Sequence, residues 1–554
     1  MSLIMAPESN SPSVETAAPT PSPEGKRTTY LLPDGTVDTS VLQDRTPRQL
    51  KLSRGATVLI AVLGLLFTFF SFLPLWHTDL WGHLSYGRWI VEHGVPTTEP
   101  LMPLDAGVPF SDLAWLSQVV GYFIYSQYGV PGIQFASACC ITAVLALFAG
   151  AVYCRTGNVF AALATMTLLL VVDSQQFFFG LMMIPRPQLA AMVCFAFTFV
   201  LGTSLSRKWW HLALIVITFA LWGNLHGSFV VGIVTLGALT VGRYIDFSWR
   251  AKNAGAGWSD PQFRHLLLAT ELATAAVLLS PYGIGVYGEA LSVAGNANVR
   301  DLVEWEPLTL RMLQGKFAAA AALLLVVLYR FSPRRVSASE MLLLVGLGVL
   351  AMWTSRMIVW WAPVVAYYIG LHLAAATKCW FNPSRYQPVR AGLNTVVALG
   401  LCWIYFAYSP LGVVLIHGRS DSPEEAAARF RKTVSPQTPV ELTNWLNENE
   451  IPRGQVFNCS EWGDYLLWAG PEDIQLFVSS HVHLTPEEVW TDYRQISWGL
   501  TGDWKNKLDR YGVNTVIMDK MVHSDMIDGM RGLDDWERAY EDRLGAVFVR
   551  RKPI

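Results

Sequence analysis

The feature that most constrains the fold is a series of long apolar runs that recur from residue 56 to residue 409. Crossing the hydrocarbon core of a bilayer takes about 20 apolar residues, and the first run, 56–75, has about that length and no small-residue cleavage site after it. The further runs lie at 131–153, 158–172, 188–205, 210–222, 228–242, 265–281, 317–330, 340–353, 357–374 and 391–409. Several are short, which gives the count an error of about one or two. The sequence therefore predicts a polytopic α-helical membrane protein with about eleven transmembrane helices.

The composition agrees with a membrane location. Hydrophobic residues make up 52% of the chain and charged residues only 15%, against roughly 25% charged residues in soluble proteins. The net charge of −2 provides no basic excess for a nucleic-acid backbone, which argues against nucleic acid as a partner. The cysteines show no C-x-x-C spacing, so the sequence does not indicate a cysteine zinc site or a dithiol redox site.

Basic residues predict the orientation of the chain, because Lys and Arg that flank membrane helices favour the cytoplasmic side. They stand before the first run and in alternate connections: Arg45, Arg48, Lys51, Arg54, Arg155, Arg207, Lys208, Arg243, Arg250, Lys252, Arg330, Arg334, Arg335, Lys378, Arg385 and Arg390. With an odd number of crossings, the N-terminus is expected in the cytoplasm and the C-terminal segment outside.

The chain divides into parts of different character. Residues 1–50 are rich in Ser, Pro, Thr and Glu and are expected to form a disordered cytoplasmic tail. Residues 51–410 are expected to form the transmembrane domain, with a large first outer loop at 76–130, and 411–437 to form a linker. Residues 438–554 alternate helix-like stretches with short β-like runs, which predicts a small extracytoplasmic α/β domain. This domain has no familiar catalytic signature, so we expect it to cover a cavity or to bind an acceptor.

The first outer loop contains an expected helix of its own. Residues 115–128, WLSQVVGYFIYSQY, combine aromatic and apolar side chains in a way that suits a helix lying at the membrane surface. We expect this helix to floor an outward-facing cavity.

The polar stretch directly after the first apolar run is the most informative part of the sequence. It has WHTDLWGHLSYGR at 76–88, where Asp79 and His83 are four residues apart and would share one helix face. One interpretation is a helix start at headgroup depth, where an aspartate is a favourable cap. The other is that the Asp79 carboxylate acts as a general base, or as a ligand of a divalent metal, on a membrane-embedded substrate. The residues themselves leave both open.

Further polar residues stand at the outer ends of the expected helices: Arg186 in IPRPQ, His226 in NLHG, Glu304 and Glu306 in EWEP, and Arg356 in TSRM. Individually, such residues are usually capping or snorkelling side chains, and NLHG also suits a tight turn between two helices. Collectively they indicate a site, because an arginine near the hydrocarbon edge needs an anion. That anion is either a carboxylate of the chain or the phosphate of a lipid-linked ligand.

Several segments carry a resemblance to a known family. They are TDLWGHLSYGRWIVEHGVP (78–96), WLSQ (115–118), RPQLAAMVCFAF (186–197), LWGNLHGSFVVG (221–232), SPYGIGVY (280–287), VEWEP (303–307), SRMIVWWAPVVA (355–366) and EWGDYLLW (461–468). In this order they resemble a bacterial family of multi-pass membrane proteins with the GT-C glycosyltransferase fold. The same fold is used by protein mannosyltransferases, oligosaccharyltransferase and the aminoarabinose transferases of lipid A. The D-x-W-x-H and N-L-H-G segments are the most specific.

The resemblance implies a transferase in a bacterial cytoplasmic membrane that uses a polyprenyl-phosphate sugar. Asp79 matches the acidic residue of the first outer loop, which would serve as base or metal ligand. Arg186 and Arg356 would bind the lipid phosphate, and His83, His226 and Glu304 would line the cavity. The resemblance implies no definite cofactor. A divalent metal is expected only if Asp79 is a metal ligand and not a base.

Two departures from the family pattern keep an alternative open. Relatives often read H-E-W-L where this chain has LAWL at 113–116, with only Asp112 nearby as an acidic residue. They also often carry Asp-x-Arg where this chain has Ser479, Ser480 and His481. The alternative is therefore a catalytically inactive membrane scaffold of the same fold that binds a lipid or a glycan.

The expected partners are a lipid-linked sugar donor, membrane lipids and an acceptor that the sequence does not identify. A transporter fits less well, because the polar residues gather on one side and no internal repeat is visible.

Overall fold

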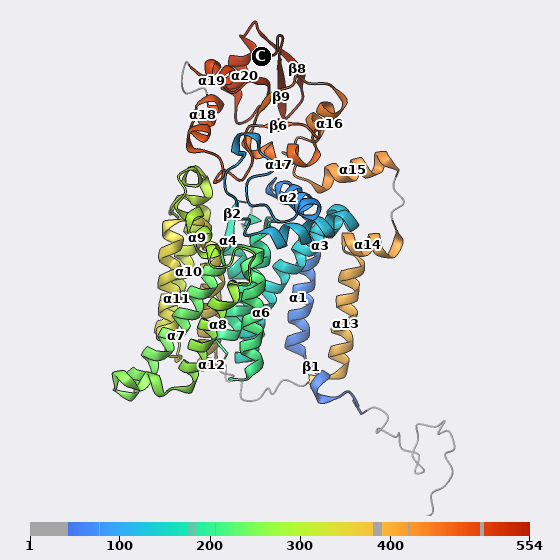
Figure 1. Cartoon of the computed structure of the whole chain (residues 1–554). Helices are drawn as coiled ribbons and strands as arrows, with labels where there is room; N and C mark the ends of the chain where they lie inside the picture. Colours follow the sequence, from blue (N-terminus) through green and yellow to red (C-terminus); the bar gives the residue numbers. More distant parts are fainter. Residues whose placement is uncertain are drawn as a thin grey trace, which may run out of the picture.

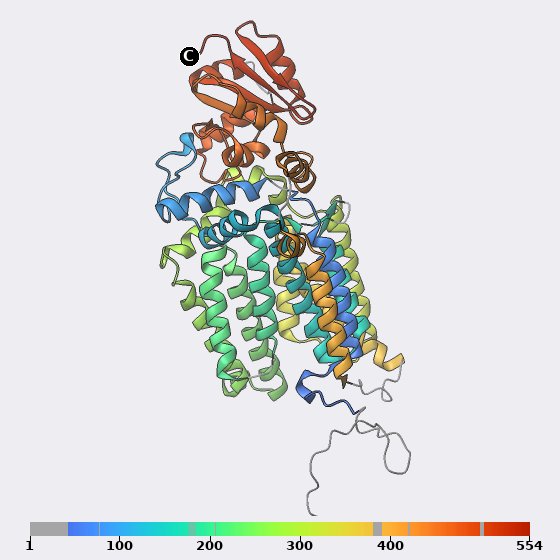
Figure 2. The same ribbon diagram turned by 90° about the vertical axis from the view of Figure 1, so that its right-hand side faces the viewer.

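A bundle of apolar helices carries a smaller α/β domain at one end (Figures 1 and 2). This computed structural model describes residues 43–76, 78–176, 179–180, 183–204, 207–380, 390–418, 422–498 and 503–554. The polytopic α-helical fold with a small C-terminal α/β domain is confirmed. Most of the tail expected at 1–50 lies outside the described residues.

The apolar helices of the bundle coincide with the apolar runs of the sequence. They are α1 (Arg54–Ser71), α3 (Trp115–Thr156), α4 (Val159–Asp173), α5 (Gln188–Gly202), α6 (Trp209–Leu225), α7 (Phe229–Ala251), α8 (Pro261–Val277), α10 (Leu313–Phe331), α11 (Ala338–Trp353), α12 (Ile358–Trp380) and α13 (Gly392–Ala407). Among the described residues, 5 helices are long and apolar enough to span a membrane, or 6 if α13 and α14 (Pro410–His417), bent by 82°, form one span. Helices α4, α5, α6 and α11 are apolar but shorter. The number of eleven spans therefore stays a prediction.

Two helices lie across the end of the bundle that bears the C-terminal domain, called the outer end below, and they separate the bundle from that domain (Figure 2). One is α2 (Asp79–His93) and the other is the first part of α3, which is separated from the rest by the non-helical Gly129, with φ 63° and ψ −150°. A glycine adopts this backbone conformation without steric cost. The expected helix at 115–128 is thus present as the outer arm of α3. The arm contacts α2 closely, since a Cβ at Gly87 would stand 2.3 Å from the Gln118 carbonyl oxygen.

Short elements complete the outer and inner connections. They are η2 (Arg48–Leu50), η3 (Pro103–Asp105), η5 (Ala254–Ser259), α9 (Gly285–Gly295), η6 (Asn298–Asp301), η7 (Val303–Trp305), η8 (Ser355–Met357), α15 (Pro423–Thr433), and the antiparallel pairs β1 (Leu52–Ser53) with β4 (Arg390–Ala391) and β2 (Ser174–Gln176) with β3 (Phe179–Gly180).

The C-terminal domain is built on a five-stranded sheet of order β6-β5-β7-β9-β8. Its strands are β5 (Gln455–Asn458), β6 (Gln475–Leu476), β7 (Val513–Asp519), β8 (Trp536–Glu541) and β9 (Gly545–Arg550), and its helices are α16 (Val440–Glu448), α17 (Ser460–Ala469), α18 (Glu487–Ser497), α19 (Trp504–Arg510) and α20 (Ser524–Arg531). Strands β6, β5 and β7 run parallel to one another, and β9 is antiparallel to both of its neighbours, β7 and β8. All residues of the central β7 are buried, as is typical of a strand covered on both faces.

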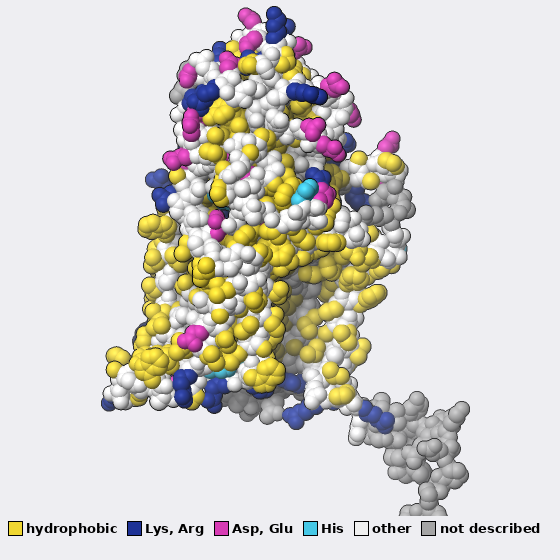
Figure 3. Space-filling view, viewed as in Figure 1, with side chains coloured by type: hydrophobic (Ala, Val, Ile, Leu, Met, Phe, Trp, Pro, Cys, Tyr) yellow, Lys and Arg dark blue, Asp and Glu magenta, His cyan; other side chains and the backbone are white. Residues whose placement is uncertain are grey.

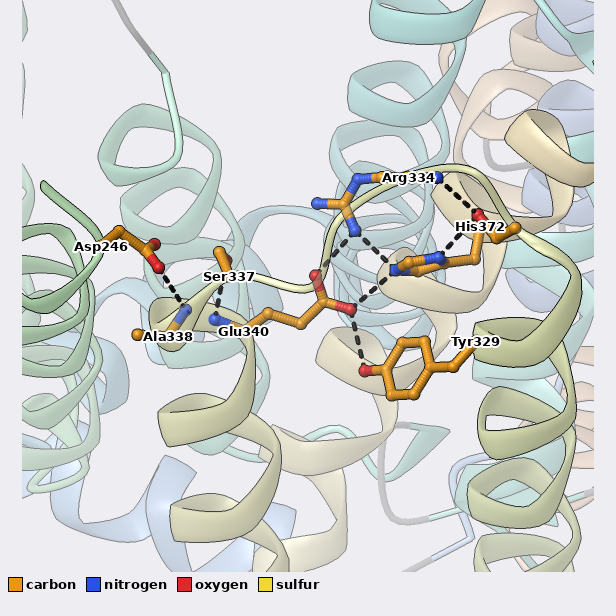
Figure 4. A network of polar contacts seen from close by, with 8 residues as sticks. Asp246, Tyr329, Arg334, Ser337, Ala338, Glu340 and His372 are labelled. Carbon is orange, nitrogen blue, oxygen red and sulfur yellow. Dashed lines mark hydrogen bonds and ion pairs between the residues drawn. The ribbon is translucent and has the colours of Figure 1, made fainter. Parts of the chain in front are cut away.

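A buried polar network ties three helices together at the end of the bundle away from the C-terminal domain (Figure 4). The Glu340 carboxylate accepts hydrogen bonds from Tyr329 Oη (2.9 Å) and Arg334 Nη1 (2.7 Å), and His372 Nε2 lies 2.9 Å from Glu340 Oε1 and 2.7 Å from Arg334 Nη1. Glu340 and His372 are fully buried. Since a buried charge is tolerated only with partners of this kind, the network fixes how α10, α11 and α12 pack.

Replacing Glu340 by alanine is expected to destabilise the bundle strongly. The change leaves Arg334 without its buried carboxylate partner, and breaking such a pair costs about 3 to 5 kcal/mol. Unfolding of the purified protein in detergent measures the loss. Glu271→Ala, on the exposed side of α8, is the matched control, and equal stability of the two variants would contradict the role given to the network.

Candidate active site

A cavity of about 2190 Å³ lies between the outer end of the bundle and the C-terminal domain. Its walls come from α2, the 110–114 segment, the turn between α6 and α7, the 289–306 segment, and the outer ends of α7 and α11. The C-terminal domain adds residues from 460–461 and 479–483. All six residues expected at the site line this cavity: Asp79, His83, Arg186, His226, Glu304 and Arg356.

Four of these residues form a chain of alternating charges. Arg186 Nη1 lies 3.2 Å from Asp79 Oδ2, and Arg186 Nη2 lies 3.3 Å from Glu304 Oε2. Glu304 Oε1 in turn accepts from Arg356 Nη1 at 2.9 Å. The Arg186 side chain is only 6% exposed, whereas that of Arg356 is 24% exposed. Arg186 therefore serves mainly to join the two carboxylates, and Arg356 is the more accessible of the two guanidinium groups.

Main-chain contacts between two short helical turns bring Glu304 and Arg356 together. The Ser355 N–H donates to the Glu306 carbonyl at 2.8 Å, and Ser355 Oγ donates to the Glu304 carbonyl at 3.0 Å. These bonds fasten η7 to η8. They place the carboxylate and the guanidinium on the same side of the cavity.

Asp79 is the first residue of α2 and lies in its first turn, and the residue at the cap position is Thr78. Its carboxylate instead faces Arg186 across the cavity wall. An acidic residue in the first turn still benefits from the helix dipole. Asp79 thus combines a place in the first turn of α2 with an ion pair to Arg186.

The two histidines are held by neighbouring polar groups. The His83 ring contacts the Gln118 amide through Nδ1 at 3.3 Å, and the same amide nitrogen donates to Asp112 Oδ1 at 3.2 Å. His226 Nδ1 accepts from the Ser228 main-chain N–H at 3.1 Å and lies 2.9 Å from Ser228 Oγ. In both histidines, a polar contact to Nδ1 therefore fixes the orientation of the ring.

Burial keeps both rings neutral. Desolvation, together with the nearby Arg186 and Arg356, lowers the pKa of His83 to about 4 and that of His226 to about 3, although Asp79 acts in the opposite direction on His83. Burial also raises the pKa of Asp112 to about 7. The histidines are thus uncharged near neutral pH.

The C-terminal domain contributes residues that the sequence pattern did not single out as site residues. The ring of His481 packs edge-on against His83, with centroids 5.5 Å apart, and against Tyr86 at 4.5 Å. Ser479, Ser480 and His481, which depart from the family pattern, all line the cavity. Gln118 was also missed as a histidine partner, although it lies in the WLSQ segment that carries the resemblance.

The C-terminal domain is fastened over the cavity by hydrogen bonds to the outer loops. Asn298 Nδ2 donates to the carbonyls of Val482 (2.9 Å) and Thr485 (2.7 Å). Asp301 accepts from Trp490 Nε1 at 3.0 Å and also pairs with Arg494. The domain therefore closes one side of the cavity.

The remaining wall of the cavity is apolar and belongs to the bundle. Val230, Val231 and Val234 of α7 face the cavity, as do Leu347 and Leu350 of α11. The two helices touch at their other ends, because a Cβ at Gly242 would lie 2.3 Å from the main-chain nitrogen of Ser339. The space between α7 and α11 thus closes toward the end of the bundle that bears the buried Glu340 network.

The described residues contain no group of three or more His, Cys, Asp or Glu side chains that could hold a metal ion. Asp79 and Glu304, the carboxylates nearest to such a role, each face a guanidinium instead. The arrangement suits anion binding and proton transfer.

Comparisons with known proteins identify the fold. No family model and no curated protein matches the sequence. The archaeal oligosaccharyltransferase AglB from Archaeoglobus fulgidus, in complex with an inhibitory peptide and a dolichol-phosphate, is similar with a TM-score of 0.51, 12% identity and coverage of 84% of this chain and 70% of that chain. The Archaeoglobus fulgidus oligosaccharyltransferase tethered with an acceptor peptide gives a TM-score of 0.50 at 14% identity, over 84% of this chain and 70% of that one. ArnT from Cupriavidus metallidurans bound to undecaprenyl phosphate gives 0.48 at 13% identity, over 90% and 98%. The chain therefore shares the fold of the two oligosaccharyltransferase structures, the GT-C fold.

Proposed function

We propose that this protein is a membrane glycosyltransferase that transfers a sugar from a polyprenyl-phosphate donor to an acceptor on the extracytoplasmic side. The observation that carries the proposal is the composition of the cavity wall. A cluster of arginines, carboxylates and histidines lies at one end, and apolar side chains of α7 and α11 continue from it. A lipid phosphate has the same division between an anionic headgroup and an apolar chain.

In the proposed reaction, Arg356 binds the donor phosphate and Asp79 accepts the proton of the attacking acceptor hydroxyl. The acceptor oxygen forms a bond to the anomeric carbon, and the bond from that carbon to the phosphate oxygen breaks. The electron pair of the broken bond stays on the phosphate, where negative charge increases. A fixed guanidinium at that point stabilises the transition state more than the ground state.

The AglB structure contains a dolichol-phosphate, which supports a lipid-phosphate ligand for the shared fold. Within this proposal, residues 51–410 form the reacting membrane domain, 411–437 link it to the rest, and 438–554 cover the cavity and contact the acceptor.

The arrangement of charge supports the proposed orientation. Lys and Arg side chains gather at the end of the bundle away from the C-terminal domain, below a broad band of hydrophobic side chains, on the face seen in Figure 3. By the positive-inside rule this end faces the cytoplasm. We therefore propose a bacterial cytoplasmic membrane location with the N-terminus inside and the C-terminal domain outside. Labelling of a cysteine placed near Arg335 by an impermeant reagent in intact cells would contradict this orientation.

One observation favours a second candidate, a scaffold that binds the lipid without reaction. Asp79 is paired with Arg186, and a guanidinium partner lowers the basicity of a carboxylate. Asp79 in this pair would then be a structural charge and not a base.

The experiment that separates the two candidates is a transfer assay on the purified protein in lipid nanodiscs. The protein is incubated with a series of polyprenyl-phosphate sugars and an extract of membrane acceptors, and release of free polyprenyl phosphate is measured. Release that depends on the protein and on the acceptor supports the transferase. Saturable binding of the donor without release with any sugar supports the scaffold.

A further inference from the structure

The ring nitrogen that carries the hydrogen in His226 is determined by a main-chain contact. The Ser228 N–H can only donate, so His226 Nδ1, at 3.1 Å, must accept. Ser228 Oγ itself accepts from Trp222 Nε1 at 3.2 Å, which leaves its own hydrogen for the same Nδ1. The hydrogen of the neutral ring is therefore on Nε2.

His83 is fixed in the same tautomer by a different partner. Gln118 Nε2 lies within 3.3 Å of His83 Nδ1 and within 3.2 Å of Asp112 Oδ1. Asp112 Oδ1 also accepts from the Ala114 N–H at 3.0 Å, as expected of an oxygen without a hydrogen, and such an oxygen is matched by the amide nitrogen of Gln118. The second hydrogen of this amide points at His83 Nδ1. His83 also carries its hydrogen on Nε2.

Both Nε2–H groups are available to a ligand. Among the described residues, no hydrogen-bond partner is found for Nε2 of His83 or His226, and both side chains line the cavity. Both rings lie close enough to Arg186 and Arg356 to interact electrostatically. These positive groups attract an anion to the place where the two N–H groups are presented.

We propose that His83 and His226 bind the oxygens of a phosphate group as neutral Nε2–H donors, beside the Arg356 guanidinium. This inference rests on the proposed function, since it assigns atoms to the headgroup of the same lipid donor. A phosphate has several acceptor oxygens and can accept from both rings and from the guanidinium together. The histidines are therefore donors and do not take the acceptor proton, because Nε2 already carries a hydrogen.

Substitution by asparagine and glutamine separates the two ring nitrogens of His226. The asparagine amide reaches the position of Nδ1, where its oxygen can still accept from Ser228, but its N–H donors do not reach the position of Nε2. The glutamine amide reaches the position of Nε2 and keeps a donor there, but it loses the contact with Ser228. A residue that matters only for the turn should therefore tolerate asparagine, and a residue that binds phosphate should tolerate glutamine.

The test measures binding of undecaprenyl phosphate to the full-length protein in nanodiscs, with undecaprenol and inorganic phosphate as separate probes. The His226→Asn protein loses one hydrogen bond to a charged acceptor. It should therefore bind undecaprenyl phosphate about 10- to 100-fold more weakly than wild type. His226→Gln should remain close to wild type, and undecaprenol should bind all three proteins equally. Competition by inorganic phosphate tells whether the headgroup is recognised without its chain.

Two results would overturn the inference. One is a His226→Asn protein that binds undecaprenyl phosphate as well as wild type, and the other is a His226→Gln protein that folds but binds as weakly as the asparagine variant. If wild type binds no undecaprenyl phosphate while it melts as a folded protein, the proposed function fails instead. The same pair of substitutions at His83, where Gln118 is the partner of Nδ1 in place of Ser228, repeats the test independently.

Discussion

Asp79→Asn is expected to lower sugar transfer by about 10² to 10⁴, the usual effect of removing a general base. Asparagine has nearly the same shape but neither the charge nor the basicity of the carboxylate. The fold should be retained, because Glu304 still neutralises Arg186 and the amide oxygen can still accept a hydrogen bond. The melting temperature and the initial rate of transfer are measured on the same preparation.

The matched control for Asp79 is Glu92→Gln, which removes a carboxylate from the exposed side of the same helix α2. It should transfer sugar like wild type. If Asp79 served only the helix start, Asp79→Asn would instead lose about 1 kcal/mol of stability with little change in rate. An active asparagine variant would rule out the proposed mechanism.

Arg356→Ala is expected to reduce kcat by about 10² to 10³, as does the removal of other groups that stabilise charge in a transition state. Glu304 keeps Arg186 as a partner in this variant, so the protein should remain folded. Arg356→Lys should restore part of the rate, since it keeps the charge but not the planar pair of donors. Steady-state kinetics with the best donor from the transfer assay provide the measurement.

Arg431→Ala is the control for the arginine variants. It also breaks an arginine–glutamate pair, with Glu441, but this pair is exposed and does not line the cavity. Exposed pairs contribute about 0 to 1 kcal/mol, so neither rate nor stability should change appreciably. A loss of rate in Arg431→Ala equal to that in Arg356→Ala would show that the effect is not specific to the cavity.

The helices could be predicted from the sequence because a bilayer allows only structures whose backbone hydrogen bonds are satisfied internally. A run of apolar residues such as 391–409 therefore indicates a helix, and α13 is found there. The local sequence also indicates the break in α3, since Gly129 is followed two residues later by Pro131. The number of spans could not be fixed, because several helices are shorter than the hydrocarbon is thick.

That the candidate residues lie in one cavity could be predicted, but not how they pair. Arg186 and Glu304 are 118 positions apart, and nothing in the local sequence of either residue indicates the other. The sequence left a choice between a carboxylate and a lipid phosphate as the partner of each arginine. In the structure, Asp79 and Glu304 are the partners of Arg186, which leaves Arg356 as the more accessible guanidinium.

The part of the site that comes from the C-terminal domain could not be predicted. His481 lies far from His83 in the sequence, and its neighbours match no catalytic signature. Their contact depends on how the domain is seated on the outer loops, through residues such as Asn298. Such interdomain contacts depend on tertiary packing and leave no periodic pattern in the sequence.

The measurement that tests the central claim most directly is photo-crosslinking of the protein in nanodiscs with a polyprenyl phosphate that carries a diazirine close to the phosphate. Peptide mapping should place the crosslinks on the cavity-facing segments 230–234 of α7 and 347–350 of α11. An excess of unlabelled polyprenyl phosphate should abolish them. Crosslinks confined to the exposed face of α13, or unchanged by the competitor, would contradict a lipid-phosphate site in this cavity.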